Sequence, residues 1–395
     1  MQQTIAIIAE RAPLFRQHSG DRRLMELVRI MARTHKVVYL STTKHKDKSD
    51  EPAIDEMKDL GIEVYTETFA LREVLSRPDL AFVFIEFFFI AEYFLPRIRI
   101  LNKNARVVVD SVDIHYCREL SQYELTKKKE DYEKALQTRK REAAVYNNAD
   151  VVLTLTPEDT KFLLKDFPGV RTHVIPNIHD IEPVDFSKRR EKTLIFVGGF
   201  YHTPNVDAMH FFCQEVMPLL AAQCPDIKLK IIGSNVPGEI RRYANENIEV
   251  IGFVPSVSEH LQQSYISVAP LRYGAGMKGK VGEALAHGIP VVTTSFGIQG
   301  MELEPGKDVM LAQRPEEYVS RIMALINDRK LYEEMSHNGM RFIRERYTPD
   351  AVSRMMDELY EETARHPAKR LPAGDYFAFW KDYLGRRIQK ICARK

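Results

Sequence analysis

Cysteine and tryptophan are scarce in this chain of 395 residues, which contains four cysteines and a single tryptophan. The cysteines (Cys117, Cys213, Cys224 and Cys392) lie far apart, and no two of them form a CxxC pair. This spacing fits neither a disulfide framework nor a zinc site, and it is typical of proteins in a reducing compartment. We therefore expect a cytoplasmic protein.

The sequence also lacks an excess of one charge and a long apolar run. It has 57 Lys and Arg against 55 Asp and Glu, and this net charge of +2 gives no reason to expect a nucleic-acid partner. The most apolar segment, Leu80 to Leu95, contains Glu86 and Glu92 and is shorter than the roughly 20 apolar residues of a membrane span. TIAIIA, at 4–9, is too short for a signal peptide. We expect a soluble protein.

Short apolar segments alternate with helical patterns along the whole chain, which predicts an α/β fold with parallel sheets. In the first half, strands are expected at residues 4–9, 36–41, 62–66, 81–86, 106–112, 151–155 and 173–176. In the second half, they are expected at residues 193–199, 227–233, 248–254, 266–271, 289–295 and 308–312. The charged segment 121–147 is expected to form one helix with a solvated face.

A polar, proline-containing stretch separates the two groups of strands. We predict an N-terminal Rossmann-like domain at 1–180, a linker at 181–192, a second Rossmann-like domain at 193–364, and a basic, aromatic C-terminal helix at 365–395. Parallel sheets of this kind bind ligands at the carboxyl ends of their strands. The ligand is therefore expected in a cleft between the two domains.

The stretch YGAGMKGKVGEALAHGIPVVTT is the most informative part of the sequence. The residues of Gly274–Gly276 have little side-chain bulk and precede an apolar-periodic helix that Gly288 ends, so backbone N–H groups at the helix start can close on an anion. Lys278 and Lys280 add positive charge, and Glu283 is placed to accept hydrogen bonds from sugar hydroxyls. A diphosphate joined to a ribose suits such a site. Taken alone, the stretch is also compatible with a helix entry that merely packs on a strand.

Extended to VAPLRYGAGMKGKVGEALAHGIPVVTT, this stretch resembles the nucleotide-sugar signature of GT-B glycosyltransferases, specifically the retaining enzymes of family 4. FVGGFYHTPNVDAMHFFCQEVMPLL and IGFVPSVSEHLQQSYISVAPL resemble further segments of that family, as do IAIIAERAPLFRQHSGDRRLMELVRIM, VVVDSVDIHYCREL and ADVVLTLTPED. VIPN is similar to the family's crossing point between domains. The likeness runs in order from about residue 5 to residue 361. It implies the GT-B fold, with two doubly wound Rossmann-like domains that face a cleft.

The resemblance implies roles for residues of the donor site. Glu283 matches the ribose-binding glutamate, Lys280 and Lys278 face the donor diphosphate, and Gly276 and Met277 offer it backbone amides. Further donor-binding residues implied in this way are Tyr273, Gly274, Gly199, His202 and Asn205.

Two departures from the family pattern leave questions open. Ala275 stands where the family places the first glutamate of a pair, eight residues before Glu283. Gly199 and Phe200 stand where many members have an arginine and a lysine. The sequence therefore leaves open which residue holds the sugar, and whether Lys280 alone neutralises the leaving group.

The N-terminal domain is expected to supply the sugar-facing and acceptor-facing groups. DSVDIHYCRE follows a strand, and a polar cluster at the carboxyl end of a parallel strand is a candidate for chemistry. By resemblance, His115 hydrogen-bonds the donor sugar, and Asp113 beside it is a second catalytic candidate; a buried structural histidine is the alternative. HSGDRRLMEL resembles the family's glycine loop, where Ser19 and Gly20 permit close backbone approach. In that loop either Arg22 or Arg23 pairs with a phosphate or acidic acceptor, or the segment is a plain capped helix start.

The function implied is a retaining, metal-independent hexosyl or deoxyhexosyl transfer from a nucleoside diphosphate sugar to a glycan, lipid-linked or other hydroxyl acceptor in cell-surface polysaccharide or glycoconjugate synthesis. No cofactor and no metal are expected. Two alternatives remain open: a non-catalytic nucleotide-sugar-binding partner subunit, and an epimerase on the same fold. The basic, aromatic tail after Pro367 leaves two interpretations, a helix packed back on the N-terminal domain and a contact with the inner face of the cytoplasmic membrane.

Overall fold

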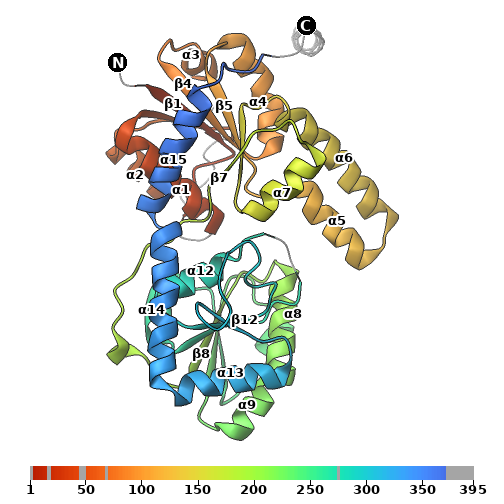
Figure 1. Ribbon diagram of the computed structural model, residues 1–395, viewed down its shortest axis with the longest axis vertical. Coiled ribbons are helices and arrows are strands. Elements are labelled where there is room, and N and C mark those ends of the chain that lie inside the picture. Colours follow the sequence, from red (N-terminus) through yellow and green to blue (C-terminus); the bar gives the residue numbers. More distant parts are fainter. Residues whose placement is uncertain (1–2, 16–18, 44–49, 67–69, 274–275, 371–395) are drawn as a thin grey trace, which may run out of the picture. The chain divides into compact units, whose positions relative to one another are not determined.

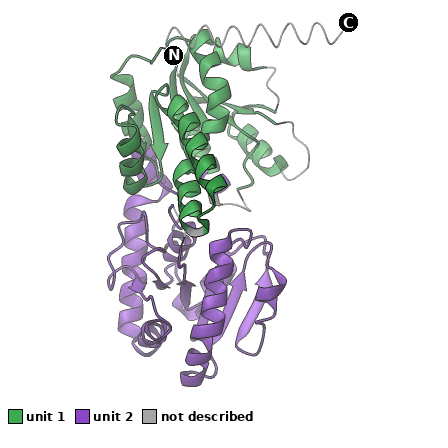
Figure 2. Ribbon diagram, turned by 90° about the vertical axis from the view of Figure 1, so that its right-hand side faces the viewer, with its two compact units in different colours: residues 1–15, 24–175, 356–395 green, residues 16–23, 176–355 purple. Residues whose placement is uncertain are grey.

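The computed structural model describes residues 3–15, 19–43, 50–66, 70–273 and 276–370. The chain divides into two compact units (Figure 2): unit 1 contains residues 1–15, 24–175 and 356–395, and unit 2 contains residues 16–23 and 176–355. Residues 16–23 are thus grouped with unit 2, and the chain passes to the main part of unit 2 at residue 176, a few residues before the predicted linker at 181–192. The predicted C-terminal helix at 365–395 lies outside the described residues from 371 onward.

Unit 1 is built on a parallel sheet of seven described strands in the order β3-β2-β1-β4-β5-β6-β7. The strands are β1 (Thr4–Ala9), β2 (Lys36–Ser41), β3 (Glu63–Tyr65), β4 (Leu80–Glu86), β5 (Arg106–Asp110), β6 (Val151–Thr154) and β7 (Thr172–Val174). All seven predicted strands are confirmed, most of them one or two residues shorter. The strand predicted to reach Val112 ends at Asp110, because Val112 has a φ of 55° and leaves the extended conformation.

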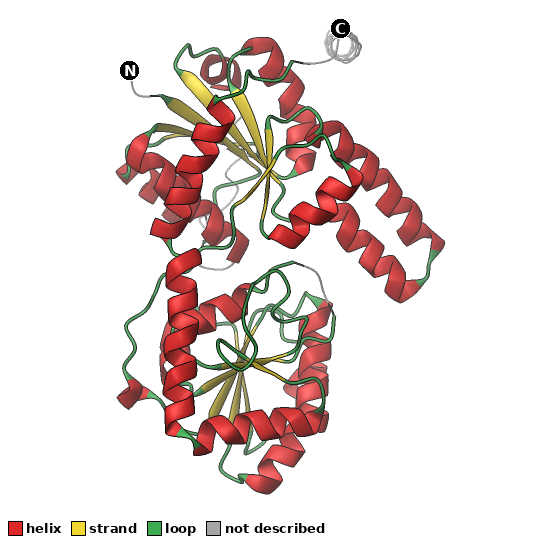
Figure 3. Ribbon diagram, viewed as in Figure 1, coloured by secondary structure: helices red, strands yellow, loops and turns green. Residues whose placement is uncertain are grey.

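Helices cover both faces of this sheet (Figure 1, Figure 3). They are α1 (Ser19–Thr34), α2 (Glu51–Asp59), α3 (Leu71–Leu75), α4 (Phe88–Leu101), α5 (His115–Thr126), α6 (Lys129–Tyr146), α7 (Pro157–Asp166) and α15 (Pro349–Ala364). The sequence assigned α15 to the second domain up to residue 364, but its last turns belong to unit 1. There the half-buried ring of Tyr360 packs on Phe82 and His35, at centroid distances of 5.0 and 4.8 Å.

The charged segment predicted as one helix over 121–147 is two helices, and that prediction is wrong. α5 ends at Thr126, Lys127 adopts a left-handed backbone with a φ of 53°, and α6 begins at Lys129. α5 and α6 lie against each other as a helical hairpin (Figure 1). No glycine or proline marks the turn, so the sequence carried little signal for it.

Unit 2 contains a second parallel sheet, with six described strands in the order β10-β9-β8-β11-β12-β13. The strands are β8 (Thr193–Val197), β9 (Lys228–Ile232), β10 (Ile248–Gly252), β11 (Ile266–Ala269), β12 (Val291–Thr293) and β13 (Met310–Leu311). Every strand predicted for the second half is present. Alternate residues of β8 enter two hydrophobic cores: Leu194 and Phe196 pack on one face of the sheet and Ile195 on the other.

The helices of unit 2 pack against the two faces of this sheet. They are α8 (Thr203–Phe211), the π-helical turn η4 (Phe212–Val216), α9 (Met217–Gln223), α10 (Gly238–Arg241), α11 (Ser258–Gln263), α12 (Gly279–Ala286), α13 (Pro315–Asn327) and α14 (Arg329–Arg346), with a short 3₁₀ turn η3 at Phe186–Lys188. Residues of α8, η4 and α13 join the core that contains Phe196, and residues of α12 and α14 join the core that contains Ile195. The predicted α/β class, with two doubly wound sheets, is confirmed.

The strand order of each sheet reverses once, and a ligand is expected to bind beside the strands where it reverses. The order changes direction beside β1 and β4 in unit 1, and beside β8 and β11 in unit 2. Loops at such a switch point diverge to opposite faces of the sheet and leave room for a ligand at the carboxyl ends of the strands. In unit 2, those loops contain Gly199 and the segment that leads to Lys280.

Candidate functional site

Lys280 lies at the centre of the switch point in unit 2. Its ammonium nitrogen donates to Oδ1 of Asn205 at 2.5 Å and lies 4.3 Å from the centroid of the Phe196 ring. Lys280 as a whole is half-buried. Burial, and secondarily the charge of Lys278, lower the pKa of Lys280 to about 7. Near neutral pH only part of the Lys280 population is then charged, and a nearby anion would stabilise the charged form.

Asn205 connects Lys280 to the loop after β8. Its Nδ2 donates to the carbonyl oxygen of Gly199 at 2.6 Å, so both ends of the buried amide are used. A Cβ atom on Gly198 would stand 2.8 Å from Nζ of Lys280 and 2.9 Å from Nδ2 of Asn205. The predicted donor residues Gly199, Asn205 and Lys280 are therefore together, and a side chain at residue 198 would displace the ammonium of Lys280 or the amide of Asn205. His202 is exposed at the N-cap of α8, on the rim of this cluster.

The loop between β11 and α12 contains the predicted donor residues that precede Lys280 in the chain. Nζ of Lys278 donates to the carbonyl oxygen of Gly276 at 2.5 Å, and Gly276 has a φ of 73°, which glycine adopts readily. Tyr273 and Met277 are partly exposed. Gly274 and Ala275 lie outside the described residues.

The amino end of α12 follows this loop and has no side-chain cap. The first backbone N–H groups of a helix lack intrahelical partners, and the helix dipole places partial positive charge there. With Lys278 at its N-cap and Lys280 at its second residue, α12 presents amides and ammonium groups together. Helix starts of this kind are suited to binding anions such as phosphate groups.

Glu283 is placed one turn into α12, and its carboxylate is held by an arginine. Nη1 of Arg22 lies 3.2 Å from Oε1 of Glu283, and Nη2 of Arg22 lies 3.6 Å from Oδ2 of Asp180. All three side chains belong to unit 2. The neighbouring Gly282 has no room for a side chain, since a Cβ there would stand 2.4 Å from the ring of the buried His179.

Arg23 and Arg22 have different surroundings. Arg23 is buried, at 2% exposure, and its Nε donates to the carbonyl oxygen of Pro176 at 3.1 Å. Ser19 and Gly20 are the first residues of α1. Of the two arginines that the sequence left as candidates, Arg22 is the one next to a predicted donor residue.

In unit 1, the polar cluster after β5 surrounds His115. Nδ1 of His115 lies 3.0 Å from the carbonyl oxygen of Asp113, and the carboxylate of Asp113 pairs with Arg118 at 2.5 Å. Phe87, Phe88 and Phe89 contact the imidazole edge-on, at centroid distances of 6.0, 5.1 and 6.0 Å. Burial lowers the pKa of His115, and the charge of Arg118 adds to that effect.

The backbone around this histidine is strained. Phe87, directly after β4, has a φ of 64°, and Val112, shortly after β5, has a φ of 55°. Bulky residues rarely adopt such values, and strain of this kind concentrates at functional sites. Neither residue was predicted as a site residue, because a positive φ at a non-glycine residue leaves no mark in the sequence.

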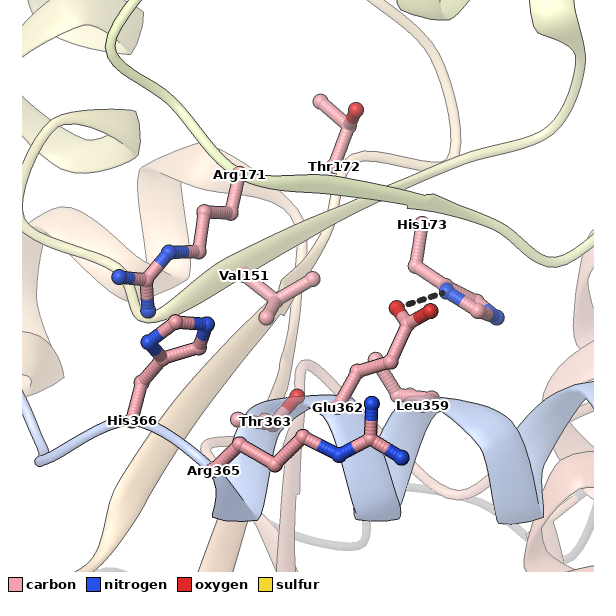
Figure 4. Close-up of a pocket in the computed structure, with 9 residues that line it drawn as sticks. All are labelled: Val151, Arg171, Thr172, His173, Leu359, Glu362, Thr363, Arg365 and His366. Atoms are coloured by element: carbon pink, nitrogen blue, oxygen red, sulfur yellow. Dashed lines mark ion pairs between the residues drawn. The ribbon is translucent and has the colours of Figure 1, made fainter.

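A pocket of about 380 Å³ in unit 1 lies away from these residues (Figure 4). It opens between the first residues of β6 and β7 and the last turns of α15, where His173 pairs with Glu362 at 3.5 Å. None of the predicted site residues lines it. It lies at the amino ends of the strands, whereas ligands of doubly wound sheets bind at the carboxyl ends.

The described residues contain neither a membrane-spanning helix nor a cluster of metal ligands. No helix in the described ranges is long and apolar enough to cross a membrane. Among those same residues, no group of three or more His, Cys, Asp and Glu side chains is arranged to hold a metal ion.

Comparison with known proteins agrees with the fold and with the predicted resemblance. Residues 191–328 match the family described as Glycosyl transferases group 1. A Klebsiella pneumoniae protein described as an uncharacterized 44.6 kDa protein in the cps region is 28% identical over 169 residues, which are 40% of this chain and 43% of that protein. The chain thus matches less than half the length of this curated relative.

Solved structures resemble nearly the whole chain. Sucrose-phosphate synthase from Thermosynechococcus elongatus matches with a TM-score of 0.68 and 14% identity, over 91% of this chain and 99% of that one. Anabaena HepE in complex with UDP matches with a TM-score of 0.66 and 14% identity, over 91% of this chain and 100% of that one. A TarM variant from S. aureus, in complex with Fondaparinux, alpha-GlcNAc-glycerol and UDP, matches with a TM-score of 0.59 and 17% identity, over 74% of this chain and 58% of that one.

At these identities the structural likeness establishes the fold, and the family match covers the strands of the second sheet and helices α8 to α13. The chain has the GT-B fold of glycosyltransferases, and its residues 191–328 match the glycosyl transferases group 1 family.

Proposed function

We propose that this protein is a glycosyltransferase that moves a sugar from a nucleoside diphosphate sugar to a hydroxyl acceptor, with retention of configuration at the anomeric carbon. The observation that carries the proposal is the cluster of Lys280, Asn205 and Gly198 beside the amino end of α12. In this cluster, a lysine with a lowered pKa lies beside the uncapped backbone amides of a helix, at the point where the strand order of the sheet reverses. UDP in complexes of structurally similar proteins supports a nucleoside diphosphate as the ligand.

In the proposed reaction, the bond between the anomeric carbon and the donor diphosphate breaks, and the acceptor hydroxyl oxygen bonds to that carbon on the same face. The hydroxyl proton passes to the departing phosphate oxygen. Lys280, Lys278 and the amides of α12 stabilise the charge that develops on the diphosphate, and Glu283 orients the ribose. His115 in unit 1 hydrogen-bonds the sugar. Such a reaction needs neither a metal nor a cofactor.

The cps region that is named for the Klebsiella relative supports polysaccharide synthesis as the setting. We propose a glycan or lipid-linked hydroxyl compound as the acceptor. A screen of UDP-, GDP- and dTDP-sugars tests the function: at least one donor should raise the melting temperature and release free nucleoside diphosphate. Binding without release of nucleoside diphosphate would instead indicate a non-catalytic partner subunit. Conversion of the donor sugar without transfer would indicate an epimerase.

The role of Glu283 predicts a dependence on the ribose. Glu283→Gln removes the charge that strengthens hydrogen bonds from the ribose hydroxyls, so KM for a UDP-sugar should rise about tenfold. The increase should be smaller for the 2′-deoxyribose analogue, which lacks one hydroxyl. Steady-state kinetics with both donors measure the difference, and Glu334→Gln on the exposed side of α14 is the matched control. An equal rise for both donors would contradict ribose recognition by Glu283.

We also propose that the basic tail after Pro367 contacts anionic membranes, where a lipid-linked acceptor would be found. Its residues from 371 onward lie outside the described structure. The full chain should sediment with phosphatidylglycerol vesicles, and a chain that ends at residue 367 should remain in the supernatant. Equal sedimentation of both forms would exclude the tail as the contact.

A further inference from the structure

Glu142 is a fully buried carboxylate that the proposed reaction does not use. It lies on α6, and its exposure is 0%. Its Oε1 accepts the backbone N–H of His115 at 2.9 Å and the hydroxyl of Tyr146 at 3.1 Å, and its Oε2 accepts the backbone N–H of Tyr116 at 3.2 Å. One side chain on α6 thus binds the first two amides of α5.

The start of α5 has no cap of its own. Ile114 occupies the N-cap position and provides no side-chain oxygen, and the nearby carboxylate of Asp113 is paired with Arg118. Glu142 therefore supplies from another helix the acceptor that an N-terminal turn requires. A buried carboxylate without a cationic partner is a costly way to do so, and burial raises the pKa of Glu142 to about 7. A helix that needed only a cap would be served by a local serine or threonine.

The Glu142 carboxylate binds the backbone of His115, the residue proposed to contact the sugar. Because the carbonyl oxygen of Asp113 only accepts hydrogen bonds, Nδ1 of His115 carries the ring hydrogen in their 3.0 Å contact. In the neutral imidazole, Nε2 then has a lone pair for a donor such as a sugar hydroxyl. This tautomer depends on the position of the His115 ring over the Asp113 carbonyl, and the first turn of α5 sets that position.

We propose that Glu142 is the positioning residue for His115. It holds the first turn of α5 in place, so that the imidazole keeps its hydrogen on Nδ1 and presents Nε2 as an acceptor. The inference rests on the proposed function only for what Nε2 contacts. The charged groups near the imidazole are Asp113, Arg118 and Glu119 from its own segment, and Glu142 from α6, whose Oε1 lies 3.8 Å from Nδ1.

The experiment compares the full chain with the variant Glu142→Gln, both labelled with isotopes at histidine. Glutamine keeps the shape of the side chain but replaces one of the two accepting oxygens with an NH2 group, which cannot accept the backbone N–H of Tyr116 or His115. Nitrogen chemical shifts should show His115 as the Nδ1–H tautomer in the unmodified chain and as a mixture in the variant. The control is Glu133→Gln on the exposed face of α6, which should leave the His115 signals unchanged.

Kinetics add a readout that a general loss of stability would not produce. Glu142→Gln should lower kcat about tenfold and leave KM for the donor within about threefold, as expected of a residue that orients a reacting group. Since Glu142 acts through His115, Glu142→Gln should lower the rate little further in a His115→Ala background. The positioning role would be overturned if the two substitutions lowered the rate independently, so that their effects multiplied. It would also be overturned if the His115 tautomer did not change in Glu142→Gln, or if that variant failed to fold. If no donor is turned over at all, the proposed function fails, and the tautomer measurement still decides the role of Glu142.

Discussion

Lys280→Ala should lower the turnover of the donor by about a thousandfold while the protein remains folded. The ammonium of Lys280 is fixed in place by Asn205 and Phe196, and one preorganised group of this kind typically contributes two to three orders of magnitude. Release of nucleoside diphosphate under single-turnover conditions measures the loss. Lys330→Ala, at an exposed position of α14, is the matched control and should be neutral.

The melting temperature separates a catalytic from a structural role for this lysine. Burial holds the pKa of Lys280 at about 7, so the folded protein gains little from its charge and should lose only a few degrees in the alanine variant. Near-normal activity of the variant would remove Lys280 from the proposed mechanism. A collapse of the melting temperature would assign the lysine to the fold instead.

The same lysine makes donor binding depend on pH. A bound diphosphate favours the charged ammonium, so the pKa of Lys280 rises in the complex, and above about pH 7 binding must take up a proton. Affinity should therefore be highest below pH 7 and fall as the pH rises, approaching tenfold per pH unit. Calorimetry in two buffers of different ionisation enthalpy measures the proton uptake, which should vanish in Lys280→Ala.

Gly198→Ala should lower donor turnover by about a hundredfold. The added methyl carbon would stand 2.8 Å from Nζ of Lys280 and 2.9 Å from Nδ2 of Asn205, so their hydrogen bond has to shift. A displacement of about 1 Å at a reacting group is enough for a loss of that size. The packing strain should cost about 1–3 kcal/mol of unfolding free energy, which a denaturant titration measures.

Gly238→Ala is the matched control for this substitution. Gly238 begins α10 in the same unit, and an added Cβ there meets nothing within 4 Å. Alanine should be neutral or slightly stabilising at that position. Equal activity of the Gly198 and Gly238 variants would show that the spacing around Lys280 is not critical.

Much of the fold was readable from the sequence because parallel strands buried on both faces form short apolar runs. β8 and β11 were expected within a few residues of their observed ends. The turn at Lys127 was not, since a left-handed lysine has no sequence signal. The burial of Glu142 was not predicted, because the residue lies in a charged segment. The spacing of the buried face of α6 does include it, together with Ala135, Thr138, Val145 and Tyr146.

The sequence by itself determined the two α/β units, their strands and the glycine–lysine loop before α12, since these depend on local periodicity and on residue chemistry. Only the tertiary structure decided which of these groups meet. The contact between Lys280 and Asn205 joins the first turns of two different helices, α12 and α8. The pairing of Arg22 with Glu283 joins residues far apart in the chain, and Glu142 reaches His115 from another helix. Such contacts arise from the crossing of loops at the switch points of the sheets and from the packing of helices, and no local pattern of residues specifies them.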